Sequence, residues 1–241
     1  MDAALQREAK RLFGPEVDLH ASPAMVRTES AEDVEGTIAA HRETPEAGAE
    51  VRPRPDVAPD TQPPRRALTA RELRTLWSHV TSLENFWTSL GEIEPGAVAR
   101  VHALATTHRW EVLFLTQRPS SAGDMVQLQS QRWLETHGFK MPSLFVMRSG
   151  SRGKVAEALG LDAVIDDRPE NCLDVVADSK AKPILVWRMR PEAVPPGVPR
   201  TGIEVVYSMQ EALDRLEQFT DERARRSTFM GRLRNAIVPK P

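Results

Sequence analysis

Three short apolar runs in the middle of the chain lead toward residue types that phosphate chemistry uses. The hydroxyl of Thr116 follows the run 111–115, Lys154 comes after two glycines at a predicted helix start, and the carboxylates of Asp166 and Asp167 follow Ala-Val-Ile. A turn after a strand can bind an anion through its N–H groups, and a helix N-terminus attracts phosphate. Paired carboxylates suit Mg²⁺, which takes one or two of them together with water and phosphate. The order of these residues therefore predicts a phosphate and Mg²⁺ site.

Each candidate also has a plainer interpretation, and the local pattern leaves both open. Thr116 suits an ordinary turn, and Lys154 suits a solvated surface. Gln117 and Arg118 follow Thr116 and are candidates for substrate binding, although the arginine can equally extend into solvent. The adjacent carboxylates need a cation or hydrogen-bond donors, because burying unpaired charge is costly. One of them, Asp167, can instead cap the helix that follows.

Predicted helices and strands alternate from residue 95 to residue 220. The predicted strands are 111–115, 143–147, 163–165, 183–187 and 203–206. The first predicted helix begins at Pro95, and three more cover about 122–137, 153–159 and 170–178. The last predicted helix starts at a capping box on Ser208. Short runs of Val, Leu, Ile and Phe without polar alternation are typical of a parallel sheet covered on both faces. We therefore predict a doubly wound α/β core, which binds ligands at the carboxyl ends of its strands.

The first third of the chain is predicted to be mostly helical. One helix covers 2–13 and stops at Gly14, a second lies near Ser30–His41, and a third starts at a capping box on Thr69. Between them, residues 44–66 contain six prolines and almost no large apolar residue, which indicates a linker. The predicted divisions of the chain are a helical region 1–94, an α/β core 95–220 and a basic C-terminal tail 221–241.

Composition limits the partners and the compartment. The 241 residues are 40% hydrophobic and 27% charged, and no apolar run approaches the roughly 18 to 20 residues that cross a bilayer. The acidic start does not resemble a secretory signal, so we expect a cytoplasmic protein without a membrane partner. The net charge is −2, and basic and acidic residues are interspersed along the chain, which argues against a nucleic-acid partner and favours a small one. The single cysteine, Cys172, excludes a cysteine metal cluster and is expected to be buried.

Taken together, the motifs resemble those of the haloacid dehalogenase-like hydrolase superfamily. Residues 114–116 resemble its second motif, Lys154 its third, and residues 164–167 its fourth. The segment 166–169, Asp-Asp-Arg-Pro, is most similar to the 5'-nucleotidase (deoxyribonucleotidase) branch. The resemblance extends over about 95–190, and each motif is short.

This resemblance implies a Rossmann-like core and a Mg²⁺-dependent phosphatase that acts on a small phosphorylated substrate of the nucleotide type. Thr116 and Lys154 would hold the transferring phosphoryl group, Asp166 would bind Mg²⁺, and Asp167 would support the metal or its waters. Residues 1–94 would serve as a helical cap. Arg168 and Asn171, which follow the aspartates, would supply supporting contacts or act only as cap and surface residues.

One motif of the family is missing. The first motif, Asp-x-Asp at the end of the first strand, supplies the nucleophile and the acid, and no Asp-x-Asp occurs in this chain. In the family this strand lies between the strands that here end at Thr116 and Asp166. Its hydrogen bonds and buried side chains together exceed the roughly 5 to 15 kcal/mol by which a domain is stable. The gap is therefore expected to be filled.

Three interpretations remain open. In the preferred one, the sequence starts too late, and the strand with its nucleophile is encoded upstream of Met1. In the second, another strand such as 203–206 fills the gap, and the protein is a non-catalytic phosphate or nucleotide binder. In the third, the resemblance is superficial, and the chain is a Rossmann-like interaction protein whose aspartates only cap a helix. As written, the polypeptide is expected to be inactive or nearly so.

Overall fold

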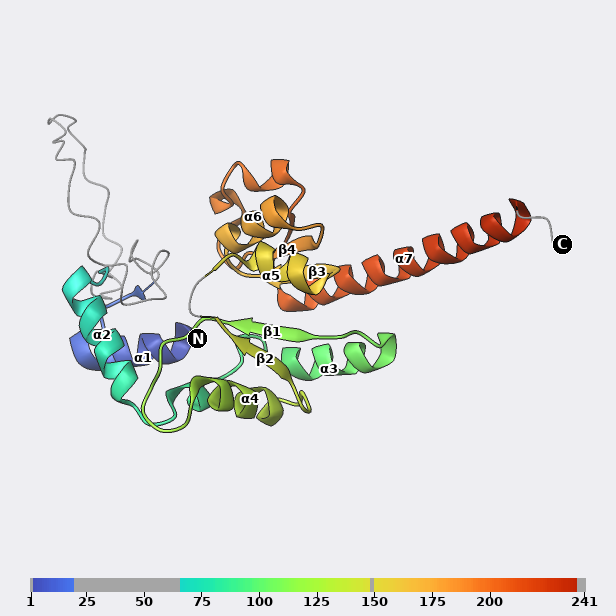
Figure 1. Ribbon diagram of the computed structural model, residues 1–241. Helices are drawn as coiled ribbons and strands as arrows, with labels where there is room; N and C mark the ends of the chain where they lie inside the picture. Colours follow the sequence, from blue (N-terminus) through green and yellow to red (C-terminus); the bar gives the residue numbers. More distant parts are fainter. Residues whose placement is uncertain (1, 20–65, 148–149, 238–241) are drawn as a thin grey trace, which may run out of the picture. The chain divides into compact units, whose positions relative to one another are not determined.

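The structure is a computed structural model that describes residues 2–19, 66–147 and 150–237 (Figure 1). The helix predicted near Ser30–His41 and nearly all of the linker 44–66 lie outside the described residues. The chain divides into two compact units. The first unit comprises residues 1–91 and 118–129, and the second comprises residues 92–117 and 130–241.

The first unit is helical, as its sequence predicts. Helix α1 (Asp2–Phe13) ends before Gly14, whose φ of 103° takes the chain out of the helix. Helix α2 (Ala70–Ser82) starts at the predicted capping box, in which the hydroxyl of Thr69 accepts a hydrogen bond from the N–H of Glu72. The two helices pack together, and the short 3₁₀ helix η4 (Phe86–Ser89) follows α2.

The second unit alternates helices and strands, so the α/β class predicted from the sequence is confirmed. In chain order it contains α3 (Ala97–His108), β1 (Leu113–Thr116), β2 (Ser143–Val146), α5 (Arg152–Leu159), β3 (Ala163–Asp166), α6 (Pro169–Asp178), β4 (Lys182–Val186), η5 (Pro191–Ala193), η6 (Val198–Thr201), β5 (Glu204–Val206) and α7 (Met209–Ile237). Helix α4 (Val126–Thr136) begins among residues of the first unit and ends in the second. The stretch expected to be a basic tail continues α7 as far as Ile237.

All strand pairs are parallel, but they form two sheets rather than one. One sheet pairs β1 with β2, and the other has the order β3-β4-β5. The single doubly wound sheet expected from the sequence is thus not formed by the described strands. Because β5 pairs with β4, the suggestion that residues 203–206 fill a position between β1 and β3 is wrong.

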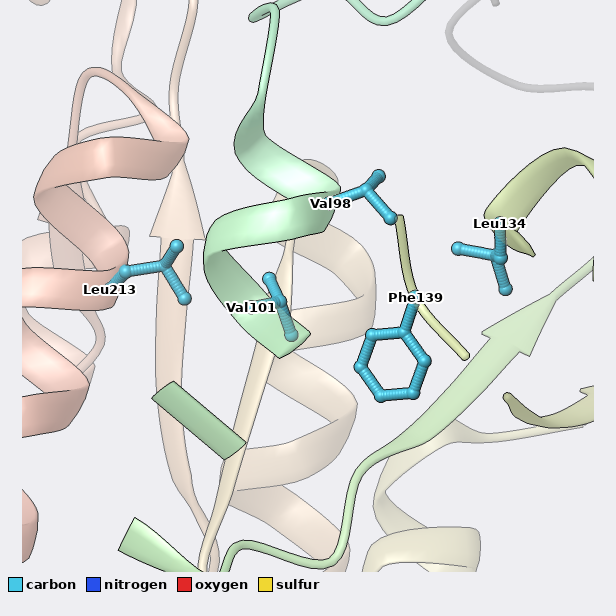
Figure 2. Packing of buried hydrophobic residues seen from close by; sticks show 5 residues of the cluster. All are labelled: Val98, Val101, Leu134, Phe139 and Leu213. Carbon is cyan, nitrogen blue, oxygen red and sulfur yellow. The ribbon is translucent and has the colours of Figure 1, made fainter. Parts of the chain in front are cut away.

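A buried cluster centred on α3 joins elements of the second unit. We call the following five residues the α3 cluster: Val98, Val101, Leu134, Phe139 and Leu213. Figure 2 shows these side chains, which come from α3, from α4 and the turn after it, and from α7. Phe114 of β1 and Ile165 of β3 also pack against the α3 cluster, so strands from both sheets contribute to one core.

Two helices begin later than the sequence predicts, and hydrogen bonds from the backbone to side chains of more distant residues explain both differences. Helix α3 begins at Ala97 because Gly96 has a φ of 82° and the Glu92 carboxylate accepts the N–H groups of Gly96 and Val98. The chain before α4 stays non-helical because Asn85 Oδ1 accepts the N–H of Asp124 at 2.8 Å. Apolar periodicity alone does not locate such anchors.

No helix among the described residues is both long and apolar enough to cross a membrane.

Candidate functional site

The candidate site centres on Asp166, the last residue of β3. Its side chain is 13% exposed, and its Oδ1 accepts the backbone N–H of Arg168 at 2.9 Å. The side-chain amide of Asn171, on the first turn of α6, donates to Oδ1 at 3.0 Å and to Oδ2 at 3.1 Å. Asp166 therefore organises the turn into α6. Asp167, expected as the possible cap, is exposed, and the N-cap position of α6 is Arg168 without a side-chain cap.

A buried arginine faces this carboxylate, and sequence reasoning missed it. The Nε atom of Arg152 lies 3.7 Å from Asp166 Oδ2, and the Arg152 side chain is only 7% exposed. The guanidinium also contacts the sulfur of Met147, just after β2, while its Nε has no hydrogen-bond partner. The sequence contained one signal for this role, because Arg152 is a second basic residue two positions before Lys154. Residues two apart on a helix point in different directions, so these two side chains need not share an environment. Arg152 thus forms an ion pair with the Asp166 carboxylate.

A close approach of two helices explains how Arg152 becomes buried. Helix α5 starts with Ser151 as its N-cap, whose hydroxyl accepts the N–H groups of Gly153 at 3.1 Å and Lys154 at 3.3 Å. A Cβ atom on Gly153 would lie 2.0 Å from the backbone oxygen of Asp174 in α6. Helices α5 and α6 therefore pack backbone to backbone at this glycine and lie side by side in Figure 1.

Burial dominates the electrostatics of the site. Desolvation raises the pKa of Asp166 above its ordinary value, and the neighbouring charge of Asp167 raises it further. The hydrogen bonds from Asn171 and Arg168 oppose this shift without cancelling it. Cys172, fully buried as predicted, has a pKa raised to about 12, mainly by burial. A second cation near Asp166, in addition to Arg152, would therefore relieve an incompletely compensated charge.

The other residues predicted for the site lie on separate elements. Thr116 ends β1, is half-buried, and its carbonyl accepts the N–H of Met147 at 2.8 Å. Gln117 follows it and is half-buried, whereas Lys154 is exposed on the first turn of α5. Within the described residues, no hydrogen bond or ion pair joins Thr116 or Lys154 to Asp166. The predicted carboxyl-end placement is thus confirmed for Thr116 and Asp166, and their direct association stays a prediction.

Arg118 has a contact that the sequence did not predict. It belongs to the first unit, where its guanidinium carbon lies 5.1 Å from the centre of the Trp87 ring. The indole N–H of Trp87 donates to the carbonyl of Pro119 at 3.0 Å, and Trp87 itself is fully buried. The segment after Gln117 is therefore anchored on Trp87, and a cation over an aromatic ring is a stabilising contact in its own right.

The residues present can meet the minimum that Mg²⁺ requires of a protein. No cluster of three or more His, Cys, Asp or Glu residues suited to a metal ion occurs in the part of the chain that the structure describes. Mg²⁺ needs only one or two carboxylates, because waters and substrate phosphate complete its octahedron. Asp166 and Asp167 supply two carboxylates, and the raised pKa of Asp166 marks charge that a cation would stabilise.

A hollow of about 460 Å³ lies elsewhere, at the amino end of β3. It is lined by residues that include Asp162, Lys182, Phe219 and Arg223. Two of the cations that line it are already paired, Lys182 with Glu204 and Arg223 with Asp162. This hollow is a weaker candidate than the carboxyl end of β3.

The fold and the site together define an α/β chain with a buried, incompletely compensated carboxylate at a strand end. No family model matches the sequence, and neither a curated protein nor a solved structure matches it.

Proposed function

We propose that the second unit is the core of a Mg²⁺-dependent phosphatase of the nucleotidase type, and that this chain lacks the nucleophile such a reaction needs. The buried Asp166 at the carboxyl end of a parallel strand, with Asp167 beside it, is the observation that carries the proposal. A continuous doubly wound sheet, with residues 1–94 as its helical cap, completes the proposed enzyme. The proposed substrate is a small phosphorylated molecule, and the cytoplasm is the proposed compartment.

The residues of this chain would divide the work of binding. The hydroxyl of Thr116 and the N–H groups after it would hold phosphoryl oxygens, with Lys154 as the cation. Asp166 and Asp167 would hold Mg²⁺, which neutralises phosphate charge when bound. Asn171 and Arg152 would keep the Asp166 carboxylate oriented, since both contact it. The 241 residues contain no Asp-x-Asp, so no residue of this chain is assigned as the acceptor of the phosphoryl group.

The absence of Asp-x-Asp favours a second candidate for the chain as written, a non-catalytic binder of phosphate or nucleotide. The same carboxylates and hydroxyl would serve it, without turnover. A pure interaction module would instead respond to neither ligand.

Thermal unfolding with Mg²⁺ and a nucleoside monophosphate tests both candidates. A ligand at 100 times its Kd stabilises the folded state by about 2.7 kcal/mol, so a rise in Tm is expected. Asp166→Asn should remove the Mg²⁺ part of the rise. The matched control is Asp162→Asn, because Asp162 precedes the same strand at its opposite end and makes the same charge change. The metal assignment is wrong if Asp166→Asn keeps the full Mg²⁺ effect.

Turnover separates the phosphatase from the binder. Release of phosphate from nucleoside monophosphates is expected only from a polypeptide that includes the nucleophile strand. A ligand-dependent rise in Tm without turnover by such a polypeptide would favour the binder, and no rise with either ligand would contradict both.

A further inference from the structure

The Asp166 carboxylate has little acceptor capacity left. A carboxylate has about four lone-pair sites, two on each oxygen. Oδ1 accepts two hydrogen bonds, from the backbone N–H of Arg168 at 2.9 Å and from the side-chain amide of Asn171 at 3.0 Å. Oδ2 accepts one hydrogen bond, from the same amide at 3.1 Å. Among the described residues, one site on Oδ2 is therefore the only acceptor position of Asp166 without a hydrogen bond.

Arg152 faces that remaining position. Its Nε lies 3.7 Å from Oδ2, which is close enough for an ion pair and too far for a hydrogen bond. The same Nε is buried and has no hydrogen-bond partner in the described part of the chain. A buried ion pair with incomplete hydrogen bonding recovers only part of the cost of desolvating its two charges. The guanidinium therefore occupies this position without being firmly bound to the carboxylate.

The position of Arg152 is set by helix α5 rather than by the carboxylate. The helix is fixed by its Ser151 cap and by the close approach of Gly153 to the backbone of Asp174. The guanidinium also contacts the sulfur of Met147, which is a weak acceptor. A stronger ligand for Oδ2 would therefore displace the guanidinium without unfolding α5.

We propose that Arg152 and a divalent cation compete for Oδ2 of Asp166. The guanidinium keeps the carboxylate oriented in the metal-free chain and gives up its place when the metal binds. Mg²⁺ as the cation comes from the proposed function, on which this inference rests. A metal ligated by Asp166 needs a lone pair, and the remaining one is the one that Arg152 faces. Asp167 is exposed and offers its carboxylate without this competition, so Arg152 lowers the affinity for the metal without abolishing it.

Mg²⁺ affinity measured with and without the guanidinium tests the competition. Isothermal titration with Mg²⁺ alone gives the Kd of the natural chain and of Arg152→Met, which removes the charge and keeps a long side chain. Arg152→Met should bind Mg²⁺ at least about tenfold more tightly, equivalent to about 1.4 kcal/mol. The matched control is Arg109→Met, because Arg109 is exposed at the end of α3, ahead of the amino end of β1. Its Kd should change less than about twofold.

A measurement on the natural chain covers the case in which Arg152→Met does not fold, since removing one member of a buried ion pair is destabilising. The Nε–H signal of Arg152, assigned through bonds by NMR, reports whether the guanidinium stays buried. Its exchange with water should quicken at least about tenfold at saturating Mg²⁺, because the guanidinium leaves Asp166. The backbone N–H of Ala156, a buried residue of α5, should keep its exchange rate because the helix stays in place.

Each outcome has a distinct meaning for Arg152 and for the metal site. Equal or weaker Mg²⁺ binding by a folded Arg152→Met, or an Nε–H that bound Mg²⁺ leaves unchanged, overturns the competition while the metal site stands. No Mg²⁺ binding by the natural chain or by Arg152→Met rejects the competition together with the proposed metal site. Tighter Mg²⁺ binding by Arg152→Met in a chain that nucleoside monophosphates do not stabilise would support the competition and reject the proposed substrate.

Discussion

Gly153→Ala is expected to destabilise the second unit strongly. The added Cβ would lie 2.0 Å from the backbone oxygen of Asp174 and 2.7 Å from Cβ of Asp178. Real Cβ contacts stay above 3.0 Å, so α5 and α6 must separate by about 1 Å (3.0 − 2.0). Overpacking costs about 1 to 3 kcal/mol, and the upper end applies because a backbone oxygen cannot rotate away. At roughly 2 to 4 °C per kcal/mol, Tm should fall by about 6 to 12 °C.

A matched control separates this clash from the general effect of removing a glycine. Gly197 has a φ of −76°, and a Cβ there would meet nothing within 4 Å. Gly197→Ala should therefore stay within about 0.5 kcal/mol of the natural chain. Urea unfolding followed by circular dichroism gives both free energies of unfolding. If Gly153→Ala is as stable as Gly197→Ala, α5 does not approach α6 closely, and the burial of Arg152 has lost its explanation.

Two further predictions follow from the pKa values near the site. Burial raises the pKa of Asp166 in the folded chain. Between the unfolded pKa, about 4, and the folded pKa, the folded chain therefore binds more protons at this group than the unfolded chain does. As a result, this group makes the free energy of unfolding fall as pH rises through the folded pKa. Asp166→Asn removes that slope, and its free energy of unfolding relative to the natural chain should therefore improve with rising pH; Asp162→Asn, which retains Asp166, should keep the slope. Urea unfolding at a series of pH values measures both, and a constant difference for Asp166→Asn would contradict the raised pKa. The thiol of Cys172, with its pKa near 12, should resist a disulfide reagent at pH 8 in the native chain and react once per chain in guanidinium, whereas native labelling at the unfolded rate would refute its burial.

The local features of the fold follow from the sequence to within a few residues. Gly14 and Gly160 end helices at positive φ, and Thr69 starts a helix with its capping box, because these signals act over one turn of chain. Strand ends were also found closely, which placed Thr116 and Asp166 correctly at carboxyl ends. Periodicity and caps are local properties, so they suffice for such features.

Tertiary features were harder to predict, since they depend on residues far apart in the chain. Gly153 was interpreted through its place beside Lys154, yet its structural role is to admit the backbone of α6. The sequence makes Arg118 a candidate for substrate binding, whereas the structure places its guanidinium over the ring of Trp87, about thirty positions earlier in the sequence. The role of Arg152 depends on the packing of α5 against α6, which buries its side chain. No local pattern encodes these approaches.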